Sequence, residues 1–490
     1  MARASARIKA QPAVEPKQEP ETPSPRIAKT AASAKTAANA KAKAAKAKAS
    51  PQKPAPKRKA QKDEDASCDS CAEKDESSDD DEKPAKRRKT TAAPKSAAAA
   101  KPAAAAKGGK AAKAKPAADD MPLAARTAVT SLKHAMYIGA HVSGAGGVQN
   151  AIGNASSIGA NAFALFLKSQ RKWASPPLAA DARAQFVSLA ASHGYDAAAH
   201  VLPHGSYLVN LAQADGAKAE QAYGCFVDDL ARCDALGVRL YNLHPGNTGG
   251  APRAAACARI AAQLNRAHAA TAAVVTVLEN MAGAGNVVGT RFEDLRDVIA
   301  LVDDKERVGV CIDTCHAFAA GYDMRTPAAF AATMAAFDDI VGLRYLKALH
   351  LNDSKAPFDS HRDLHANIGT GFLGLRAFHS VVNYAPLAGL PMVLETPIDR
   401  KGPDGKSVED RQVWADEIKL LESLIGMDAE SDAFAALERE LQDRGAAERQ
   451  KIQDQVDKKT AKETKKAAPK KTAAKPRGRK KKEETDDESD

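Results

Sequence analysis

An apolar run closes with a carboxylate and an imidazole in the stretch Val308-Gly-Val-Cys-Ile-Asp-Thr-Cys-His316. A buried strand with this ending presents Asp313 and His316 as two metal-ligand side chains at one edge of a sheet. Four other short apolar runs end in the same way. They lead into His244 in Tyr241-Asn-Leu-His244, Glu279 in Val277-Leu-Glu279, His350 in Lys347-Ala-Leu-His350 and Glu395 in Met392-Val-Leu-Glu395. This repetition predicts a polynuclear metal site at the rim of a barrel.

Short apolar runs alternate with Ala-rich helical stretches, such as 217–236 and 253–270, through the middle of the chain. The apolar runs are continuous, as in parallel strands that are covered on both faces. The predicted strands are Tyr137–Ser143, Asn161–Leu167, Asp196–Leu202, Leu240–Leu243, Val274–Glu279, Val308–Asp313, Leu346–Leu351 and Pro391–Glu395. Eight strand–helix units predict a TIM (β/α)8 barrel. An open doubly wound sheet would carry a Gly-rich phosphate loop after its first strand, and Gly144-Ala-Gly-Gly147 lacks that spacing.

Composition separates this barrel from two tails. We predict a disordered Lys/Ala/Pro-rich basic tail over 1–130, the barrel over 133–427, and a charged tail, partly helical to disordered, over 428–490. Residues 1–120 carry a net charge of +12 and residues 431–490 carry +3, and the whole chain carries +11, which leaves −4 for the middle. The basic character therefore belongs to the tails, while the acidic middle suits a protein that collects cations.

Compact basic clusters in both tails indicate a nuclear protein. The clusters are Lys86-Arg-Arg-Lys89 and Lys475-Pro-Arg-Gly-Arg-Lys-Lys-Lys482. Such clusters bind nuclear import receptors or DNA. The sequence leaves a mitochondrial pool open. No apolar run is long enough to span a membrane, and the seven cysteines follow no disulfide-framework spacing, so we expect no membrane association and a reducing compartment.

The carboxyl ends of the predicted strands bring a larger set of ligand-type side chains to one rim, because active sites of TIM barrels form there. The set is His204, His244, Glu279, Asp313, His316, His350, Asp363, His365 and Glu395. A buried carboxylate such as Glu279 is costly unless it is paired. A single histidine or aspartate at a strand end is usually a hydrogen-bonded structural residue, which is how we interpret His141 and His200, although His141 also ends a strand on the same rim. Imidazole and carboxylate ligands without a thiol suit Zn²⁺ or Mn²⁺.

Three further stretches carry a family resemblance. They are His204-Gly-Ser-Tyr-Leu-Val-Asn-Leu-Ala212, Gly309-Val-Cys-Ile-Asp-Thr-Cys-His316 and Leu349-His-Leu-Asn-Asp-Ser-Lys355. They resemble the three signatures of the endonuclease IV family of apurinic/apyrimidinic (AP) endonucleases, also called AP endonuclease family 2. The resemblance runs from about Tyr137 to Leu424 and includes neither tail, so the chain resembles a eukaryotic form with basic tails.

The resemblance implies a zinc-dependent AP endonuclease of DNA base-excision repair with three Zn²⁺ ions. By this resemblance, His204, His244 and Glu279 would hold one zinc ion. Glu279 would bridge to a second zinc ion, which Asp313, His350 and Glu395 would also hold. The third zinc ion would be held by His316, Asp363 and His365. The implied reaction cuts the phosphodiester bond 5′ to an abasic site, leaves 3′-hydroxyl and 5′-deoxyribose phosphate ends, and extends to cleaning blocked 3′ ends. Glu279 is the implied catalytic residue, and a monomer is implied.

The same resemblance assigns residues to the DNA partner, double-stranded DNA with abasic sites or blocked 3′ ends. Arg171, Tyr207 and Leu208 match residues that enter the duplex and keep it bent. Two positions depart from the family pattern: Asp359 stands where a small residue is usual, and Leu364 stands where a polar residue is common.

Two other functions remain open from the residues alone. A sugar isomerase or epimerase of the same barrel class would also place Glu, Asp and His around two metals. The pair Asp363 and His365, the loops with Arg171 and Tyr207, and the basic tails count against it. A non-catalytic chromatin protein with a degenerate barrel is the second alternative, and the intact ligand set counts against that one.

Overall fold

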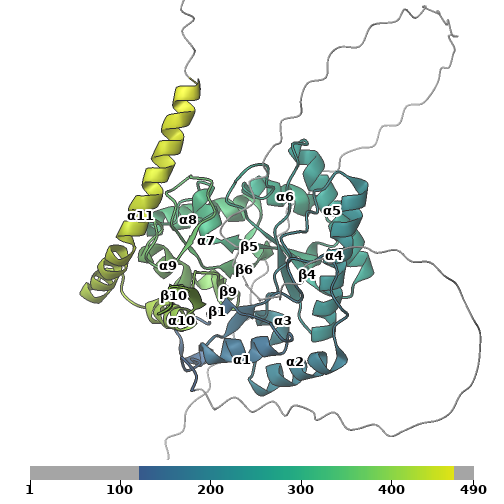
Figure 1. The fold of residues 1–490 in the computed structure, drawn as a ribbon, viewed down its shortest axis with the longest axis horizontal. Helices are drawn as coiled ribbons and strands as arrows, with labels where there is room; N and C mark the ends of the chain where they lie inside the picture. Colours follow the sequence, from purple (N-terminus) through teal and green to yellow (C-terminus); the bar gives the residue numbers. More distant parts are fainter. Residues whose placement is uncertain (1–120, 468–490) are drawn as a thin grey trace, which may run out of the picture. The chain divides into compact units, whose positions relative to one another are not determined.

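Residues 121–467 are the part of the chain that this computed structural model describes. A parallel sheet of seven strands, in the order β2-β1-β9-β6-β5-β4-β3, lies at its centre (Figure 1). These strands are β1 (Tyr137–His141), β2 (Ala162–Ala164), β3 (Leu240–Leu243), β4 (Val275–Glu279), β5 (Val308–Asp313), β6 (Leu346–His350) and β9 (Pro391–Leu394). Two short antiparallel pairs lie outside this sheet: β7 (Asp353–Ser354) with β8 (His365–Ala366), and β10 (Asp399–Lys401) with β11 (Ser407–Glu409).

The sheet closes into a barrel through the segment 201–205, which lies between β2 and β3. The Leu202 amide donates to the Phe163 carbonyl at 2.9 Å, and the Asn242 amide donates to the Pro203 carbonyl at 2.9 Å. These bonds join the two edges of the sheet, so the predicted TIM barrel is confirmed. The strands predicted near β1, β3, β4, β5, β6 and β9 are found with small differences at their ends.

The third predicted strand, Asp196–Leu202, is wrong over most of its length. The chain forms the short helix α3 (Ala197–His200), because the Asp196 carboxylate accepts hydrogen bonds from the amides of Ala198 and Ala199 and caps it. Only Val201 onward pairs with the neighbouring strands, through isolated bridges. Pro203 has no N–H to donate, so a regular ladder cannot continue there.

Helices lie around the sheet (Figure 1). Besides α3 they are α1 (Asn150–Ser157), α2 (Ala180–Ser192), α4 (Gly216–Leu236), α5 (Arg253–Ala270), α6 (Phe292–Leu301), α7 (Thr314–Ala319), α8 (Pro327–Ile340), α9 (Leu375–Val382), α10 (Gln412–Leu424) and α11 (Asp432–Ala467). The helices expected over 217–236 and 253–270 are confirmed as α4 and α5. Among the described residues, no helix combines the length and apolar character needed to cross a bilayer.

The apolar core has two layers. Six strands and the closing segment each contribute one buried side chain to the barrel interior: Ala164, Leu202, Leu240, Val277, Cys311, Ala348 and Val393. A larger cluster fills the space between the sheet and the helices and includes Phe226 of α4 and Phe292 of α6. The interior layer lies beneath the carboxyl ends of the strands, so it supports the rim where the predicted site residues lie.

The described part begins before the predicted start of the barrel. Residues 121–130, assigned by the sequence to the N-terminal tail, contain packed side chains. The Arg126 guanidinium lies 3.9 Å from the centre of the Tyr195 ring and donates to Asn161 at 2.8 Å. Residues 1–120 and 468–490, which include both basic clusters, lie outside the described residues. Residues 428–467 of the predicted C-terminal tail are described and contain helix α11, in agreement with a partly helical tail. The domain boundaries stay a prediction.

Gly139 in β1 provides a test of the barrel packing. It pairs with Ala162 of β2 and Val393 of β9, and a Cβ atom at this position would lie 1.6 Å from the Ala162 carbonyl oxygen. We expect Gly139→Ala to lower the free energy of unfolding by about 3 kcal/mol or more, because two backbone strands must separate. Chemical denaturation monitored by circular dichroism measures this change.

Gly153→Ala is the matched control. Gly153 lies in α1, and a Cβ atom there would have no neighbour within 4 Å. Alanine is the better helix former, so this variant should gain up to about 1 kcal/mol. A Gly139→Ala protein as stable as the wild type would contradict the packing of β1 against β2.

Candidate metal centre

The predicted ligand residues lie together at the carboxyl ends of the strands. Glu279, Asp313 and His350 are the last residues of β4, β5 and β6. His244 and Glu395 directly follow β3 and β9. The remaining members come from the closing segment (His204), from α7 (His316), and from β8 and the residues before it (Asp363, His365). The barrel therefore brings all nine residues to one rim, and their role as metal ligands stays a prediction.

The carboxylate of Glu279 lies at the centre of this group. Its Oε2 atom is 3.3 Å from His204 Nε2 and 3.6 Å from His244 Nε2. Its Oε1 atom is 3.2 Å from the Nδ1 atoms of His350 and His316. One carboxylate thus faces four imidazoles, two on each oxygen. His204 and His244 on Oε2 and His350 on Oε1 are arranged as expected around a carboxylate that bridges two metal ions, whereas the Nδ1 atom of His316 also lies 2.9 Å from the Asn280 carbonyl oxygen.

Two further carboxylates extend the cluster on either side of Glu279. Glu395 Oε2 lies 3.3 Å from His350 Nδ1. Asp363 lies 3.1 Å from the Nε2 atoms of both His316 and His365. Potential ligand atoms converge within 4.8 Å in two of the sets that the resemblance implies: His204, His244 and Glu279, and Glu279, Asp313, His350 and Glu395. His316 and His365 converge with Asp313, while Asp363 and His365 converge with Cys315.

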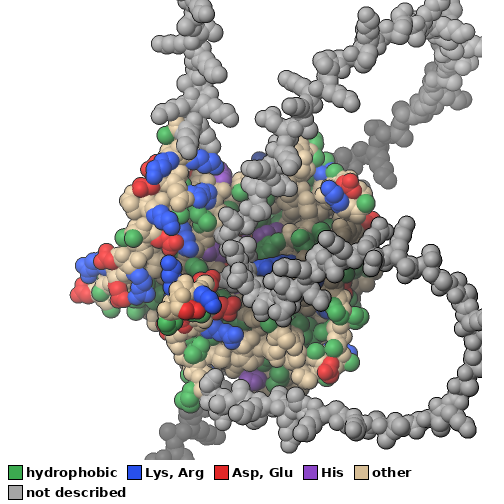
Figure 2. All heavy atoms as spheres, in the orientation of Figure 1, with side chains coloured by type: hydrophobic (Ala, Val, Ile, Leu, Met, Phe, Trp, Pro, Cys, Tyr) green, Lys and Arg blue, Asp and Glu red, His purple; other side chains and the backbone are tan. Residues whose placement is uncertain are grey.

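The cluster is closed below and opens to solvent above. Glu279, Asp313 and His350 are completely buried, whereas the side chains of His244 and Glu395 are 24% and 14% exposed. Histidine side chains are visible near the middle of the face that Figure 2 shows. The exposed side of the cluster is where a substrate can reach it.

Hydrogen bonds of the histidines test whether the residues suit a metal. The Nδ1 atoms of His204, His316 and His365 lie 2.8, 2.9 and 3.2 Å from backbone carbonyl oxygens. A carbonyl oxygen only accepts, so each Nδ1 carries a proton, and in the neutral imidazole it is Nε2 that presents the lone pair. These Nε2 atoms face carboxylate oxygens, and two acceptors repel each other unless a proton or a cation lies between them. Imidazoles fixed in this way are typical of metal ligands.

The balance of charges in the cluster also indicates that it suits metal cations. In the part of the chain that the structure describes, no lysine or arginine forms an ion pair with Glu279, Asp313 or Glu395. Burial of several carboxylates side by side is costly without positive charge. The donor set, with five imidazoles and four carboxylates, therefore fits divalent cations such as Zn²⁺.

The pKa values reflect this demand for positive charge. Burial acts to raise the pKa of Glu279, yet the imidazoles of His350 and His244 hold that pKa well below its ordinary value. For His316, burial acts to lower the pKa, but Asp313 and Asp363 hold it well above its ordinary value. Burial lowers the pKa of His244 to about 4, so its imidazole is neutral at pH 7. Neutral imidazole is the form that binds metal.

Three asparagines that the sequence analysis did not single out hold Glu279 and Asp313 in place, two through the carboxylates and one through the backbone. Asn242 Nδ2 donates to Glu279 at 2.6 Å, and Asn352 Nδ2 donates to Asp313 at 2.6 Å. Asn280 Oδ1 accepts from the Asp313 amide at 2.7 Å. All three lie next to or near predicted ligands in sequence, and this adjacency was the only signal that could have indicated them. Such outer contacts orient metal ligands.

Comparison with known proteins finds relatives that are similar to this chain in sequence and in fold. A profile described as xylose isomerase-like TIM barrel matches residues 152–424. Apurinic-apyrimidinic endonuclease 1 of Saccharomyces cerevisiae is 46% identical over 303 residues, 62% of this chain and 79% of the yeast protein. Probable endonuclease 4 of Campylobacter curvus is 47% identical over 289 residues, 59% of this chain and 98% of that protein. Endonuclease IV from Thermus thermophilus has a crystal structure with a TM-score of 0.50 and 32% identity, covering 59% of this chain and 99% of that one. The chain belongs to the endonuclease IV family.

Membership in the endonuclease IV family makes the protein a DNA-cleaving hydrolase of DNA repair, as the sequence predicted. One departure from the family pattern has a structural reason. Asp359 has a positive φ of 56°, a backbone region that small residues adopt readily and that Asp and Asn tolerate better than most others. The aspartate therefore fits the backbone at this position of the loop.

The two predicted DNA-contact loops lie next to each other. The Ser206 hydroxyl donates to the Gln170 carbonyl at 2.8 Å, which joins the loop of Arg171 to the loop of Tyr207 and Leu208. The Tyr207 side chain is 42% exposed, and its ring centre lies 5.3 Å from that of His244. The structure thus brings these loops to the same rim as the metal cluster. Their role in DNA contact stays a prediction.

The two histidines interpreted as structural differ in their surroundings. His200 stacks on Tyr137 with ring centres 3.5 Å apart, away from the cluster, as a structural residue would. His141 Nδ1, in contrast, lies 3.0 Å from Glu395 Oε1. His141 therefore belongs to the surroundings of the predicted metal site, and its place at the end of the first strand was the available signal.

Metal content tests the cluster directly. We expect His204→Gln to lose about one equivalent of zinc per chain, because three-ligand sites rarely retain metal after losing a ligand. Inductively coupled plasma mass spectrometry after dialysis measures the content. His268→Gln is the control, since His268 is also buried but its imidazole bonds Thr276, at 3.0 Å, outside the cluster. Unchanged zinc in His204→Gln would contradict the assigned ligand set.

Proposed function

We propose that the protein is a zinc-dependent AP endonuclease of DNA base-excision repair. It hydrolyses the phosphodiester bond 5′ to an abasic site and leaves 3′-hydroxyl and 5′-deoxyribose phosphate ends. It also cleans blocked 3′ ends as a 3′-phosphodiesterase and 3′-phosphatase. One observation supports the proposal: Oε2 of the Glu279 carboxylate faces His204 and His244 while Oε1 faces His350, as a carboxylate shared by two metal ions would.

Three zinc ions fit the donor set. One would be held by His204, His244 and Glu279, a second by Glu279, Asp313, His350 and Glu395, and the third by His316, Asp363 and His365. When bound, zinc would lower the pKa of a water molecule so that it ionises near neutral pH. The zinc ions would also stabilise negative charge on phosphate oxygens.

The chain's own residues contribute orientation. The Asn242 amide holds Glu279 Oε2, and the Nδ1–H group of His204 donates to a backbone carbonyl, so both side chains are fixed before a substrate arrives. The buried side of the cluster excludes water from below. A scissile phosphate can therefore approach from the partly exposed side of the cluster, where His244, Glu395 and Asp363 lie.

Recognition of the abasic site requires that the damaged nucleotide leave the base stack. Arg171, Tyr207 and Leu208 are proposed to enter the duplex there and to keep it bent. Tyr207 is well placed for this role, because its exposed ring lies beside His204 and His244.

The tails complete the proposal. The clusters 86–89 and 475–482 would bind a nuclear import receptor, and the tails would add salt-dependent affinity for DNA. Microscopy of chains that lack each cluster tests nuclear import. The same proposal includes a monomeric state and a location in the nucleus, with a second pool of the protein in mitochondria as an alternative.

Replacement of the bridging carboxylate tests the reaction. We expect Glu279→Gln to lower incision of a duplex with one abasic-site analogue by about 10³-fold or more, since loss of a bridging ligand removes several kcal/mol of charge stabilisation. Chelation of zinc should abolish incision by the wild type. Gel analysis of the product ends identifies the bond that is cut.

Glu422→Gln is the control for this substitution. Glu422 is also a buried glutamate, but it bonds Thr127 and Lys419 away from the cluster. Incision by this variant should stay within about twofold of the wild type. Near-normal incision by Glu279→Gln, or isomerase activity on a free sugar without incision, would overturn the proposal.

Arg171 separates DNA recognition from bond cleavage. We expect Arg171→Ala to lower kcat/KM on the abasic duplex by about 10-fold or more and to leave hydrolysis of a small chromogenic phosphodiester unchanged. Arg344→Ala, an exposed arginine that precedes β6 and so lies at the opposite end of the barrel, should change neither activity. Equal losses on both substrates would show that Arg171 acts in the metal centre instead.

A further inference from the structure

Helix α11 lies beyond the family match, which ends at residue 424, and yet it contacts the segment that carries Asp363 and His365. We call residues 355–371 the Asp363 loop. Gln442 Nε2 of α11 donates to the carbonyl oxygens of Gly369 and Gly371 at 2.7 and 3.0 Å. Arg449 Nη1 donates to the Thr370 carbonyl at 2.6 Å. The part of the loop just after His365 is therefore held by α11.

Gly445 makes this contact possible. Glycine is unfavourable in the middle of a helix, and Gly445 lies within the 36-residue helix α11. A Cβ atom at this position would lie 1.9 Å from the Thr370 carbonyl oxygen. Only glycine lets the helix backbone come this close to the loop. The contact with Thr370 thus explains why a glycine stands at this position, although glycine is a poor helix former.

The part of the loop before Asp363 also contacts α11. Lys355 forms an ion pair with Glu448 at 3.4 Å, and the Arg362 guanidinium donates to Gln455 Oε1 at 3.4 Å. Arg362 immediately precedes Asp363. Contacts with the one helix therefore lie on both sides of the Asp363–His365 pair.

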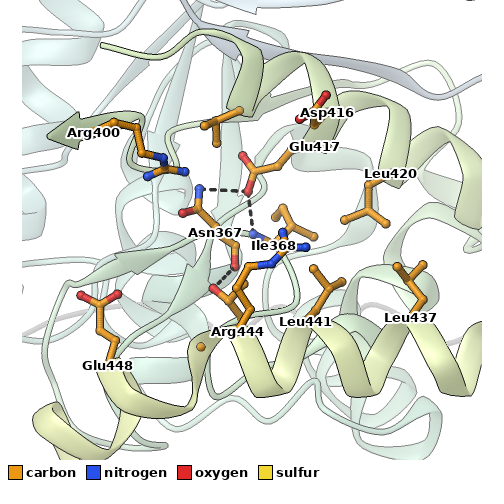
Figure 3. A pocket seen from close by; sticks show the side chains of 13 residues that line it. Asn367, Ile368, Arg400, Asp416, Glu417, Leu420, Leu437, Leu441, Arg444 and Glu448 are labelled. Atoms are coloured by element: carbon orange, nitrogen blue, oxygen red, sulfur yellow. Dashed lines mark hydrogen bonds between the residues drawn. The ribbon is translucent and has the colours of Figure 1, made fainter. Parts of the chain in front are cut away.

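The opposite side of the loop is held by α10. Glu417 accepts from the Ile368 amide at 2.7 Å and from Asn367 Nδ2 at 3.2 Å. Figure 3 shows Glu417 on one side of these residues, with Leu441 and Arg444 of α11 on the other, around a cavity of about 600 Å³.

We propose that α11 is a positioning element for one of the three metal sites, the site of His316, Asp363 and His365. The inference rests on the proposed function. His316 lies in α7, directly after β5, and its position depends on the barrel itself. Asp363 and His365 lie on the loop that α11 holds. Disturbing α11 should therefore loosen one zinc ion and spare the other two.

A pair of substitutions in the full-length chain tests this role. In Gly445→Ala the added methyl group pushes α11 away from Thr370, although alanine is the better helix former. We expect one of three zinc equivalents to pass to a chromophoric chelator at least about 10-fold faster than in the wild type, as outer contacts of metal ligands affect affinity by this order. Incision activity should fall in parallel.

Ala446→Gly is the matched control. Ala446 is the exposed neighbour of Gly445, so this change weakens the helix without touching the loop. Its zinc release should follow the wild type. If Gly445→Ala does not fold, Gln442→Ala replaces it, with Gln450→Ala as control, because Gln450 bonds only Asp454 of α11.

Each other outcome overturns the inference. The inference is overturned if the variant that disturbs the contact releases zinc at the wild-type rate, or if all three of its zinc ions are released faster to the same extent. It is also overturned if the control variant releases one zinc ion as fast as the variant that disturbs the contact. A wild-type chain that binds fewer than three zinc equivalents and does not incise the abasic duplex overturns the proposed function itself. Three equivalents with incision and no effect of the variant overturn only the role of α11.

Discussion

Burial of the Glu279 carboxylate is the constraint on which the rest of the site depends. The carboxylate has no exposed surface, and its two oxygens lie within 3.6 Å of four imidazoles. A buried anion needs positive charge close by. Within the described part of the chain no lysine or arginine pairs with it, and three of the five predicted histidine ligands turn Nδ1 toward a backbone carbonyl and Nε2 toward a carboxylate. The cluster is therefore built around cations.

The barrel meets this constraint by bringing strand ends to one rim. Parallel strands end at the same edge, so residues far apart in sequence, such as His204 and Glu395, become neighbours. The asparagines that follow or precede these ends supply the remaining hydrogen bonds. Elements outside the rim add to this support: α10 and α11 hold the Asp363 loop from two sides.

Much of the fold was predictable because the core strands are continuous apolar runs with turn-forming ends. The exception at 196–202 shows the limit of that signal. The Ala-rich stretch there is compatible with either a strand or a helix, and the Asp196 cap decides for a helix. His141 shows a second limit: its place at a strand end indicates the rim, but the sequence around it does not show that Glu395 lies beside it. A contact between distant segments leaves no local pattern.

The sequence by itself determined the residue types of the centre, the strand ends that carry them and the family resemblance, because these depend on local patterns of apolar and ligand-type residues. Only the tertiary structure decided which oxygen of Glu279 faces which imidazole, which asparagine holds which carboxylate, and that α11 reaches the loop of Asp363. Those relations depend on how far-separated segments pack, and packing geometry is fixed by the whole chain at once.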